Sequence, residues 1–238
     1  MTKSSPSNDA YNAAYYAENG QSGDRPALWM YERFWKRYCD KRGPVLEFGG
    51  GVGWFAKRLT RHAKVFECES NAFARESLAQ IAPEAIAVED LSTMETDSVS
   101  SIVALHVLEH IPDDALSAIF AEFDRIARPG ARFMFVMPDL DGAAHLAKRE
   151  GWSAFTDPTH INLKGHDAWQ AFFRSVGLKP VQTFADGFYD FPYAQTLAGR
   201  AVFDSLRLAR TGIQFLLARP LLKSGDGENI VFILERAE

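Results

Sequence analysis

The chain has 238 residues, carries a net charge of −5 at pH 7 and is 47% hydrophobic. This length suits one large domain, or one domain with an elaborated cap. The acidic balance argues against a general nucleic-acid-binding surface, so double-stranded nucleic acid is not an expected partner.

Cysteine usage and local hydropathy bear on the compartment. Cys39 and Cys68 lie outside any CxxC pair, so neither a disulfide framework nor a zinc knuckle is expected, and the reducing cytoplasm is the simplest location. The first ten residues lack the apolar core of a signal peptide. Residues 201–222 are the most apolar segment, but no membrane span is expected because charges interrupt it at Asp204, Arg207, Arg210 and Arg219.

The first two thirds of the chain alternate between strand and helix patterns. A helix with aromatic residues at helical spacing is predicted over 26–41, with Pro26 near its start. The pattern then predicts, in order, a strand at 44–48, a helix at 54–62, a strand at 63–68, a helix at 71–82, strands at 85–89 and 98–106, a helix at 113–127 capped by Asp113, and a strand at 131–138. Such alternation indicates a parallel sheet with helices on both faces.

The regular alternation of strand and helix patterns ends after Pro138. An irregular stretch at 151–165 precedes a helix near 166–176, and strands are predicted at 178–185 and 229–237. We expect these two strands to pair antiparallel, with the intervening residues and their long helix as an excursion over one end of the sheet. The expected fold is therefore a Rossmann-like, seven-stranded, mostly parallel sheet with helices on both faces, an antiparallel C-terminal strand and a helical cap. Its expected parts are an N-terminal helical cap (1–42), an α/β core (43–185), a cap insertion (186–227) and a C-terminal core strand (228–238).

The sequence VLEFGGGVGWF (45–55) places a glycine-rich turn after the first strand. Such a turn lets a ligand approach the backbone, and G-x-G-x-x-A from Gly51 is compatible with a dinucleotide. Glu47 would repel a pyrophosphate but suits an ammonium or sulfonium group, although it could also pair with a lysine. Glu69 ends the second strand, where an acid can accept hydrogen bonds from a ribose diol. Asp90 follows the third strand and could either meet a nucleobase edge or cap a turn.

Three segments together resemble class I S-adenosylmethionine-dependent methyltransferases. EFGGGVG is similar to their (D/E)-x-G-x-G-x-G turn. LHVLEHIPD (105–113) resembles the LEH segment of a subgroup that includes quinone-pathway, polyketide and sugar methyltransferases. RPGARFMFVMPD (128–139) resembles their Pro-Gly turn and fifth strand. The resemblance spans roughly residues 40–185 and implies S-adenosylmethionine as the cofactor.

The resemblance also implies cofactor-binding residues. Glu47 and the backbone around Gly49, Gly51 and Gly53 would hold the methionine portion of the donor. Glu69 would bind the ribose hydroxyls, and Asp90 and Leu91 would border the adenine. The backbone near Leu105 and His106 would flank the donor. Gly50 stands where the pattern has a larger residue, and it is expected to add flexibility.

Candidate catalytic groups follow the fourth and fifth strands. His106, Glu109 and His110 form H-x-x-E-H, and on a helical turn they would share one face. His160 lies in DPTHINL, which should reach the same pocket, as a general base, a substrate contact or a residue that orders the loop. We take His160, His110 and Glu109 as the catalytic candidates.

A metal site is the less favoured interpretation of these groups. They are similar to the E-x-x-E-H plus distal His arrangement of small-RNA 3′-end methyltransferases and some quinone O-methyltransferases, with His106 in place of the first Glu. Three imidazoles and one carboxylate would suit a borderline metal better than Mg²⁺. The favoured interpretation has no metal, and Glu109 and His110 shape the turn or contact the substrate.

Two segments outside the core are expected to set acceptor specificity. Tyr11, Tyr15 and Tyr16 could close over the donor, and Tyr15 and Tyr16 are expected to touch substrate. Tyr189, Asp190 and Tyr193 could line an acceptor pocket, whose aromatic character suits a ring, sugar or lipid-linked molecule. Residues 201–222 could dock on a membrane surface, form a dimer contact or pack on the cap, and membrane contact is not favoured. A monomer and a homodimer are both compatible with the sequence.

The expected function is methyl transfer from S-adenosylmethionine to a small molecule or glycan, at oxygen, by in-line displacement with histidine-assisted deprotonation. Two alternatives stay open. One is a Rossmann-type NAD-dependent oxidoreductase, against which Glu47 argues. The other is a non-catalytic methyltransferase-like binding module.

Overall fold

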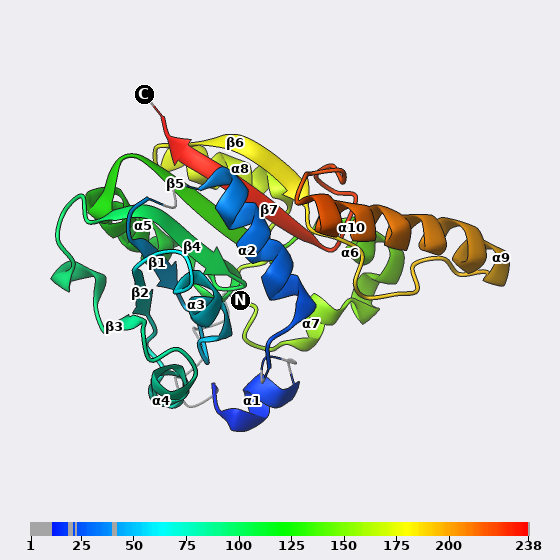
Figure 1. Cartoon of the computed structure of the whole chain (residues 1–238). Coiled ribbons are helices and arrows are strands. Elements are labelled where there is room, and N and C mark those ends of the chain that lie inside the picture. Colours follow the sequence, from blue (N-terminus) through cyan, green and yellow to red (C-terminus); the bar gives the residue numbers. More distant parts are fainter. Residues whose placement is uncertain (1–10, 19–20, 22, 40–41, 238) are drawn as a thin grey trace.

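A seven-stranded sheet forms the centre of the computed structural model, which describes residues 11–18, 21, 23–39 and 42–237 (Figure 1). The strands follow the order β3-β2-β1-β4-β5-β7-β6 across the sheet. Their bounds are Ile86–Val88 (β3), Val65–Cys68 (β2), Val45–Phe48 (β1), Val99–Leu105 (β4), Ala127–Pro138 (β5), Asn229–Arg236 (β7) and Leu178–Ala185 (β6). Strands β1 to β5 pair in parallel, and β7 runs antiparallel to both neighbours. The expected fold class is confirmed, including the antiparallel pairing of β6 with β7.

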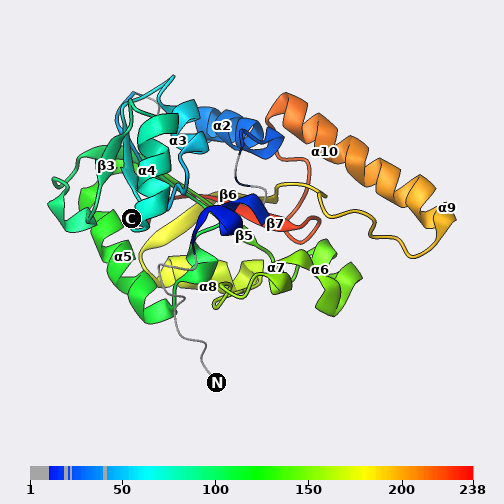
Figure 2. The same ribbon diagram turned by 90° about the horizontal axis from the view of Figure 1, so that it is seen from below.

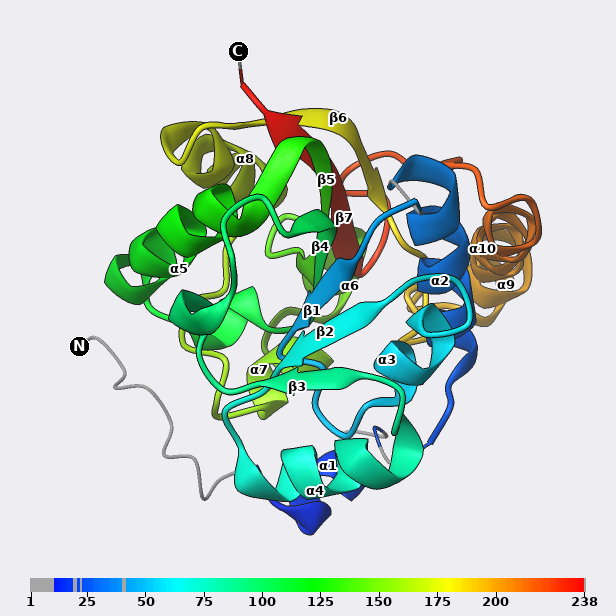
Figure 3. The same ribbon diagram turned by 60° about the vertical axis from the view of Figure 1, so that its left-hand side comes forward.

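Helices cover both faces of this sheet. Figure 3 shows α2 and α3 on one side and α5 and α8 on the other. The helices are Ala13–Glu18 (α1), Pro26–Tyr38 (α2), Trp54–Leu59 (α3), Ala72–Ile81 (α4), Asp113–Ile126 (α5), Ala143–Lys148 (α6), Ser153–Thr156 (α7), His166–Ser175 (α8), Leu197–Gly199 (α9) and Ser205–Leu217 (α10). Short 3-10 turns lie at Leu91–Thr93 (η2), Leu108–His110 (η3) and Arg149–Gly151 (η4), and a π-turn, η5, lies at Arg200–Asp204.

Two apolar layers hold the helices to the sheet. On the α5 and α8 side, Phe123 and Phe173 are fully buried against Phe135 of β5. On the other side, Phe34 and Trp35 of α2 are fully buried. Each such side chain contributes roughly 1.5–3 kcal/mol by leaving water. This burial fixes the sheet as a rigid platform, so the loops at its carboxyl edge are held in place.

Some local expectations differ from the structure. Pro112 is the N-cap of α5, so Asp113 is its first residue rather than its cap. The Asp113 carboxylate instead accepts hydrogen bonds from Asn162 Nδ2 and Lys164 Nζ, each at 2.8 Å. β5 begins at Ala127, which pairs with Val99 of β4, and regular pairing resumes at Arg132 after an irregularity at the Pro-Gly segment. The stretch expected to be irregular contains η4 and α7.

The excursion between β6 and β7 carries α9, η5 and α10, which project from the body in Figures 1 and 2. The solvent face of this segment is apolar, with exposed fractions between 48% and 63% for Val202, Phe203, Leu206, Ile213, Leu216 and Leu217. Within the described residues, no helix is long and apolar enough to cross a membrane. The proposed division into parts stays a prediction, and residues 1–10, 19–20, 22, 40–41 and 238 of it lie outside the described residues.

Candidate active site

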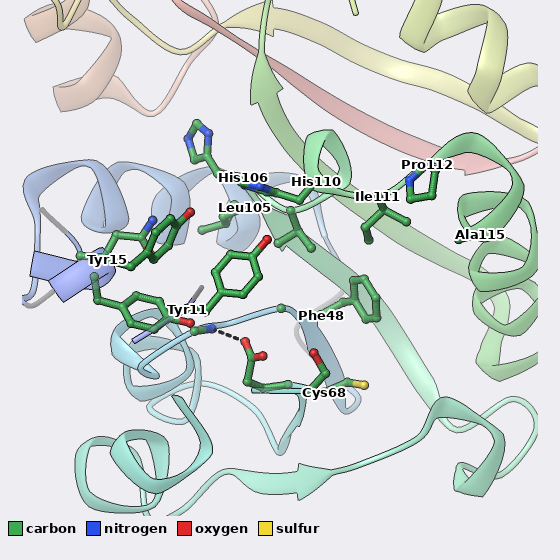
Figure 4. A pocket seen from close by; sticks show the side chains of 17 residues that line it. Tyr11, Tyr15, Phe48, Cys68, Leu105, His106, His110, Ile111, Pro112 and Ala115 are labelled. Atoms are coloured by element: carbon green, nitrogen blue, oxygen red, sulfur yellow. Dashed lines mark hydrogen bonds between the residues drawn. The ribbon is translucent and has the colours of Figure 1, made fainter. Parts of the chain in front are cut away.

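A cavity of about 320 Å³ opens at the carboxyl ends of β1, β2 and β4. Open α/β sheets bind ligands at this edge. Figure 4 shows Tyr11 and Tyr15 on one side of the cavity and Phe48, Ile111 and Pro112 on the other. The lining residues come from α1, the glycine turn, the end of β2, the segment after β4 and the start of α5: Tyr11, Tyr15, Tyr16, Gln21, Phe48, Gly49, Gly51, Cys68, Glu69, Ser70, Leu105, His106, Val107, His110, Ile111, Pro112 and Ala115.

Glu69 links the glycine turn to the cavity. Its Oε2 accepts a hydrogen bond from Gly51 N at 3.1 Å, and its Oε1 accepts one from Asn71 N at 2.8 Å. Burial raises the pKa of the carboxyl, and these backbone donors oppose the rise. The side chain is therefore held in one orientation at the cavity wall, with lone pairs left to accept from a ligand diol.

Gly50 packs where no side chain would fit. A Cβ on this residue would lie 2.7 Å from both Glu47 Cδ and Glu67 Oε1. Its backbone N–H also donates to Glu67 Oε1 at 2.8 Å. The expectation that Gly50 adds flexibility is therefore wrong, because a close approach to two carboxylates explains the glycine.

Three carboxylates gather beside the turn. Glu47 and Glu67 are paired in register on neighbouring strands, and both are buried. Burial, together with neighbouring carboxylates, raises the pKa of Glu47 well above its ordinary value and that of Glu67 to about 8. Glu67 was not predicted, although it lies on β2 two residues before Glu69, which directly follows that strand. A bound cation would favour the ionised form of these carboxyl groups, so the grouping suits a cationic ligand better than an anionic one.

A second cavity of about 50 Å³ adjoins the first at Gly49 and Leu105. Arg25 and Glu47 both line this second cavity. Neither Arg25 Nε nor Glu47 Oε2 has a hydrogen-bond partner among the residues that the structure describes. A guanidinium and a carboxylate on the walls of one small cavity suit an α-amino acid zwitterion. Arg25 was not predicted, since no motif distinguishes it from the other arginines.

The adenine-side role expected of Asp90 and Leu91 stays a prediction. Asp90 accepts a hydrogen bond from Ser92 N at 2.8 Å and caps η2, as its alternative interpretation expected. Leu91 is buried in the core cluster that includes Phe123. Neither residue lines the cavity. The apolar residues there, Phe48 and Ile111 among them, were not predicted. Gly53 is also outside the lining and packs closely against Leu78.

His106 and His110 both line the cavity, but not through a shared helical face. His106 has a φ of +56°, in the left-handed region, and the helical turn spans only η3. The expectation that positions 106, 109 and 110 lie on one helical turn is therefore wrong. The side chains still meet, because His106 Nδ1 lies 3.5 Å from Glu109 Oε1.

The loop at 157–162 docks on η3. The backbone carbonyl of Glu109 accepts hydrogen bonds from Ile161 N at 3.1 Å and Asn162 N at 2.9 Å. This contact brings the His160 ring to 4.7 Å from the His110 ring, measured between centroids. His160 thus joins the predicted catalytic group, but it lies behind His110 rather than in the cavity lining.

Glu109 is fully buried between these imidazoles. Burial opposes its charge, but the nearby imidazoles of His106, His110 and His160 hold the pKa of its carboxyl below the ordinary value. Burial also lowers the pKa of His110. The group therefore favours a charged carboxylate beside a neutral His110 imidazole at neutral pH.

Helix α1 closes one side of the cavity. Tyr15 Oη donates to Asp157 Oδ2 at 3.0 Å, which ties α1 to the His160 loop. A Cβ at Gly51 would lie 3.1 Å from the Tyr16 ring, and the Tyr11 and His110 rings are 6.1 Å apart. The lining therefore includes Tyr15 and Tyr16, both predicted to touch substrate.

The residues predicted from the excursion do not join this cavity. Tyr193 is buried with Phe188 in a separate cluster. Asp190 forms an ion pair with Lys148 at 2.6 Å, and Tyr189 Oη lies 3.5 Å from Met30 Sδ. Their predicted role in acceptor binding has no support from the cavity as the structure has it.

Comparisons with known proteins identify related sequences and structures. The family model described as "Methyltransferase domain" matches residues 24–183, about two thirds of the chain. No curated protein matches the sequence.

Solved structures share the fold at low sequence identity. A SAM-dependent methyltransferase from Archaeoglobus fulgidus is 13% identical, with a TM-score of 0.66 over 94% of this chain and 100% of that chain. A TehB-like SAM-dependent methyltransferase from Corynebacterium glutamicum is 16% identical, with a TM-score of 0.57 over 96% and 97%. The Burkholderia thailandensis 1,6-didemethyltoxoflavin-N1-methyltransferase, with S-adenosylhomocysteine bound, is 12% identical, with a TM-score of 0.57 over 97% and 85%. At these identities the likeness concerns the fold.

Proposed function

The chain belongs to the methyltransferase domain family, and on this premise we propose that it transfers the methyl group of S-adenosylmethionine to an oxygen atom of a small molecule or glycan. The protein is a methyltransferase, and S-adenosylmethionine is its methyl donor. One observation supports the finer proposal most directly. A single cavity runs from the glycine turn and Glu69 to His106 and His110, so donor and acceptor can meet inside it.

The two cavities would hold different chemical parts of the donor. The methionine portion would lie against Glu47 and Arg25, where the carboxylate faces the ammonium and the guanidinium faces the α-carboxylate. Glu69 would accept hydrogen bonds from the ribose hydroxyls. The adenine would lie in the apolar part of the cavity, against Phe48 and Ile111. The buried carboxylates near the turn would stabilise the positive sulfonium.

The transfer itself is an in-line displacement. The acceptor oxygen forms a bond to the methyl carbon as the bond from that carbon to sulfur breaks, and neutral S-adenosylhomocysteine leaves. Because the sulfonium is already activated, alignment supplies much of the rate enhancement. A hydroxyl acceptor must also lose its proton. His110 borders the cavity and has Glu109 and His160 behind it, so these three residues are the groups that would activate the acceptor.

The alternative functions fit less well. A nicotinamide dinucleotide would bring its pyrophosphate against the carboxyl groups of Glu47, Glu67 and Glu69, which offer an anion no positive charge and repel it when ionised. A non-catalytic module would not need a histidine and carboxylate group at the far end of the donor cavity. The aromatic lining, with Tyr11, Tyr15 and Tyr16, favours an acceptor that carries a ring or a sugar.

Calorimetry with S-adenosylmethionine and S-adenosylhomocysteine tests the donor part of the proposal. We expect wild-type protein to bind both, and Glu69→Ala to weaken binding by roughly 10–100-fold, because charged hydrogen bonds contribute about 1.5–3 kcal/mol. Glu76→Ala, on a nearby helix, is the matched control, and NADH is the control ligand. Binding of NADH alone would contradict the proposal.

A screen with isotopically labelled methyl donor tests the acceptor part. Phenols, sugars and lipid-linked sugars are offered in parallel, and the methylated atom is assigned by mass spectrometry and NMR. We expect label on oxygen. Label on nitrogen or carbon would retain the methyltransferase and overturn the proposed O-methylation.

A further inference from the structure

Three potential metal ligands converge behind the wall of the donor cavity. Glu109, His110 and His160 each offer one ligand atom, and these atoms lie within 4.8 Å of one another. Both carboxylate oxygens of Glu109 are buried and accept no normal hydrogen bond from the described part of the chain. The nearest imidazole nitrogens, His106 Nδ1 at 3.5 Å and His160 Nε2 at 3.9 Å, are both too distant for one. A fully buried carboxylate without donors is costly unless a cation compensates it.

The hydrogen bonds of His160 determine which ring nitrogen is free. Its Nδ1 lies 2.6 Å from the carbonyl oxygen of Ala154, which can only accept. Nδ1 therefore carries a proton, and the other ring nitrogen, Nε2, faces Glu109 at 3.9 Å. A lone pair directed at a carboxylate is repulsive unless a proton or a metal ion lies between them.

His110 is held in the same way. Its Nδ1 lies 3.2 Å from the carbonyl oxygen of Thr159 and 2.9 Å from Thr159 Oγ1. Since Thr159 Oγ1 donates its own proton to Asp157 Oδ1 at 2.5 Å, it accepts from His110. The proton again lies on Nδ1, and Nε2 is left with a lone pair. An Nδ1–H bonded to a carbonyl oxygen is the arrangement that orients metal-binding histidines.

From this convergence we propose that Glu109, His110 and His160 bind one divalent transition-metal ion, with Zn²⁺ as the best-matched ion. Two neutral imidazoles and one carboxylate suit Zn²⁺ better than Mg²⁺, which prefers oxygen ligands. Metal–ligand bonds of about 2.0–2.2 Å place ligand atoms roughly 3–4 Å apart, so small side-chain rotations close the site. Three protein ligands leave a fourth position open.

The open position gives the ion a role that rests on the proposed methyl transfer. His110 borders the cavity, so an acceptor hydroxyl can reach the ion from there. Coordination lowers the pKa of that hydroxyl, its proton passes to water, and the resulting alkoxide or phenoxide attacks the methyl carbon. His110 then acts through the ion rather than by taking the proton itself.

A second group of potential metal ligands, formed by Asp139, Asp141 and His166, differs from the first in its hydrogen bonding. The Asp139 carboxylate already accepts hydrogen bonds from Asp141 N, His166 N and His166 Nδ1. Its charge is thus compensated within the protein, and no ion is required there.

Metal binding by the full chain tests the proposal. Protein stripped with a chelator is titrated with Zn²⁺ by calorimetry, and a Co²⁺-loaded sample is examined for the visible bands of a four-coordinate site. We expect one equivalent of Zn²⁺ in wild type and in His166→Ala, and affinity at least about 100-fold lower in Glu109→Gln and His160→Ala. Mg²⁺ is titrated in parallel and should not compete.

S-adenosylhomocysteine binding, measured on the same samples, separates the two proposals. Variants that lose Zn²⁺ but keep S-adenosylhomocysteine are folded and support the metal site. If wild type binds S-adenosylhomocysteine but no Zn²⁺, or if Glu109→Gln and His160→Ala keep wild-type Zn²⁺ affinity, the metal site is overturned and the methyltransferase proposal stands. Loss of S-adenosylhomocysteine binding in wild type would instead contradict the proposed function.

Discussion

At the scale of single residues, the site depends on buried carboxyl groups whose pKa values are raised by burial and by one another. Glu47 and Glu67 lie side by side on β1 and β2, and Gly50 has no Cβ so that the turn can pass them. Within the described chain, Glu47 Oε2 and Glu67 Oε2 have no hydrogen-bond partner. Burying these groups lowers the stability of the folded protein, and the same lack of partners favours the binding of a cationic donor.

The raised pKa of Glu67 predicts a stability that falls with increasing pH. Its carboxyl has a pKa of about 8 in the folded protein, against an ordinary value of 4.5. Between these values the folded state holds the proton and the unfolded state does not. The contribution of this group to the free energy of unfolding is therefore fully present below about pH 4.5, and it is lost as the pH rises through 8. The loss is at most about 5 kcal/mol.

Urea unfolding between pH 5 and 8.5 measures this effect. We expect Glu67→Gln, which keeps the shape and removes the titration, to flatten the decline relative to wild type. The control is Glu84→Gln, at an exposed position between α4 and β3, and it should follow the wild-type curve. Equal slopes in wild type and Glu67→Gln would contradict the prediction.

At the scale of elements, short segments far apart in sequence build the site. The loop at 157–162 reaches η3 through two hydrogen bonds to one carbonyl, and α1 reaches that loop through Tyr15. The excursion is held in a comparable way. Gln214 of α10 is fully buried and bonds to four backbone groups, at Ala185, Asp186, Leu221 and Leu222.

Replacing Gln214 predicts local release of α10. Gln214→Leu leaves buried carbonyl and N–H groups without partners, each costing about 1–3 kcal/mol. We expect hydrogen exchange to accelerate by at least ~10-fold over 197–222 while β1 to β5 stay protected. Ile213→Leu, at the neighbouring exposed position, is the control. If exchange rose equally throughout the sheet, the excursion would be part of the global folding unit instead.

At the scale of the whole molecule, the cavity collects residues from several elements between Tyr11 and Ala115. Its walls include α1, the turn after β1, the end of β2 and the start of α5. A ligand that fills it therefore contacts several of these segments at once, and its binding energy adds to the stability of the folded state.

Thermal denaturation with ligand tests this bridging. At 100 times its Kd, S-adenosylhomocysteine adds about 2.7 kcal/mol, which corresponds to a rise in Tm of roughly 5–10 °C for a chain of this size. NADH at the same concentration should leave Tm unchanged. A Tm unaffected by S-adenosylhomocysteine, in protein that binds it by calorimetry, would mean that the ligand binds the unfolded chain equally well.

The sequence by itself determined the sheet, the order of its elements and the place of the glycine turn. These features follow from hydrophobic periodicity and from motifs whose residues are neighbours in the chain, so they can be predicted without coordinates. Glu69, the glycines Gly49 and Gly51, and the pair His106 and His110 belong to this group, because each lies at the carboxyl end of a predicted strand.

Only the tertiary structure decided which distant side chains share a wall. Arg25 and Glu47 line the same small cavity, and His160 lies behind His110. Tyr189 and Tyr193 are outside the lining of the main cavity. No local pattern encodes these outcomes, because they depend on how loops of different length dock on the sheet edge. The orientation of each imidazole was decided in the same way, since it follows from a carbonyl oxygen that the fold brings to its Nδ1.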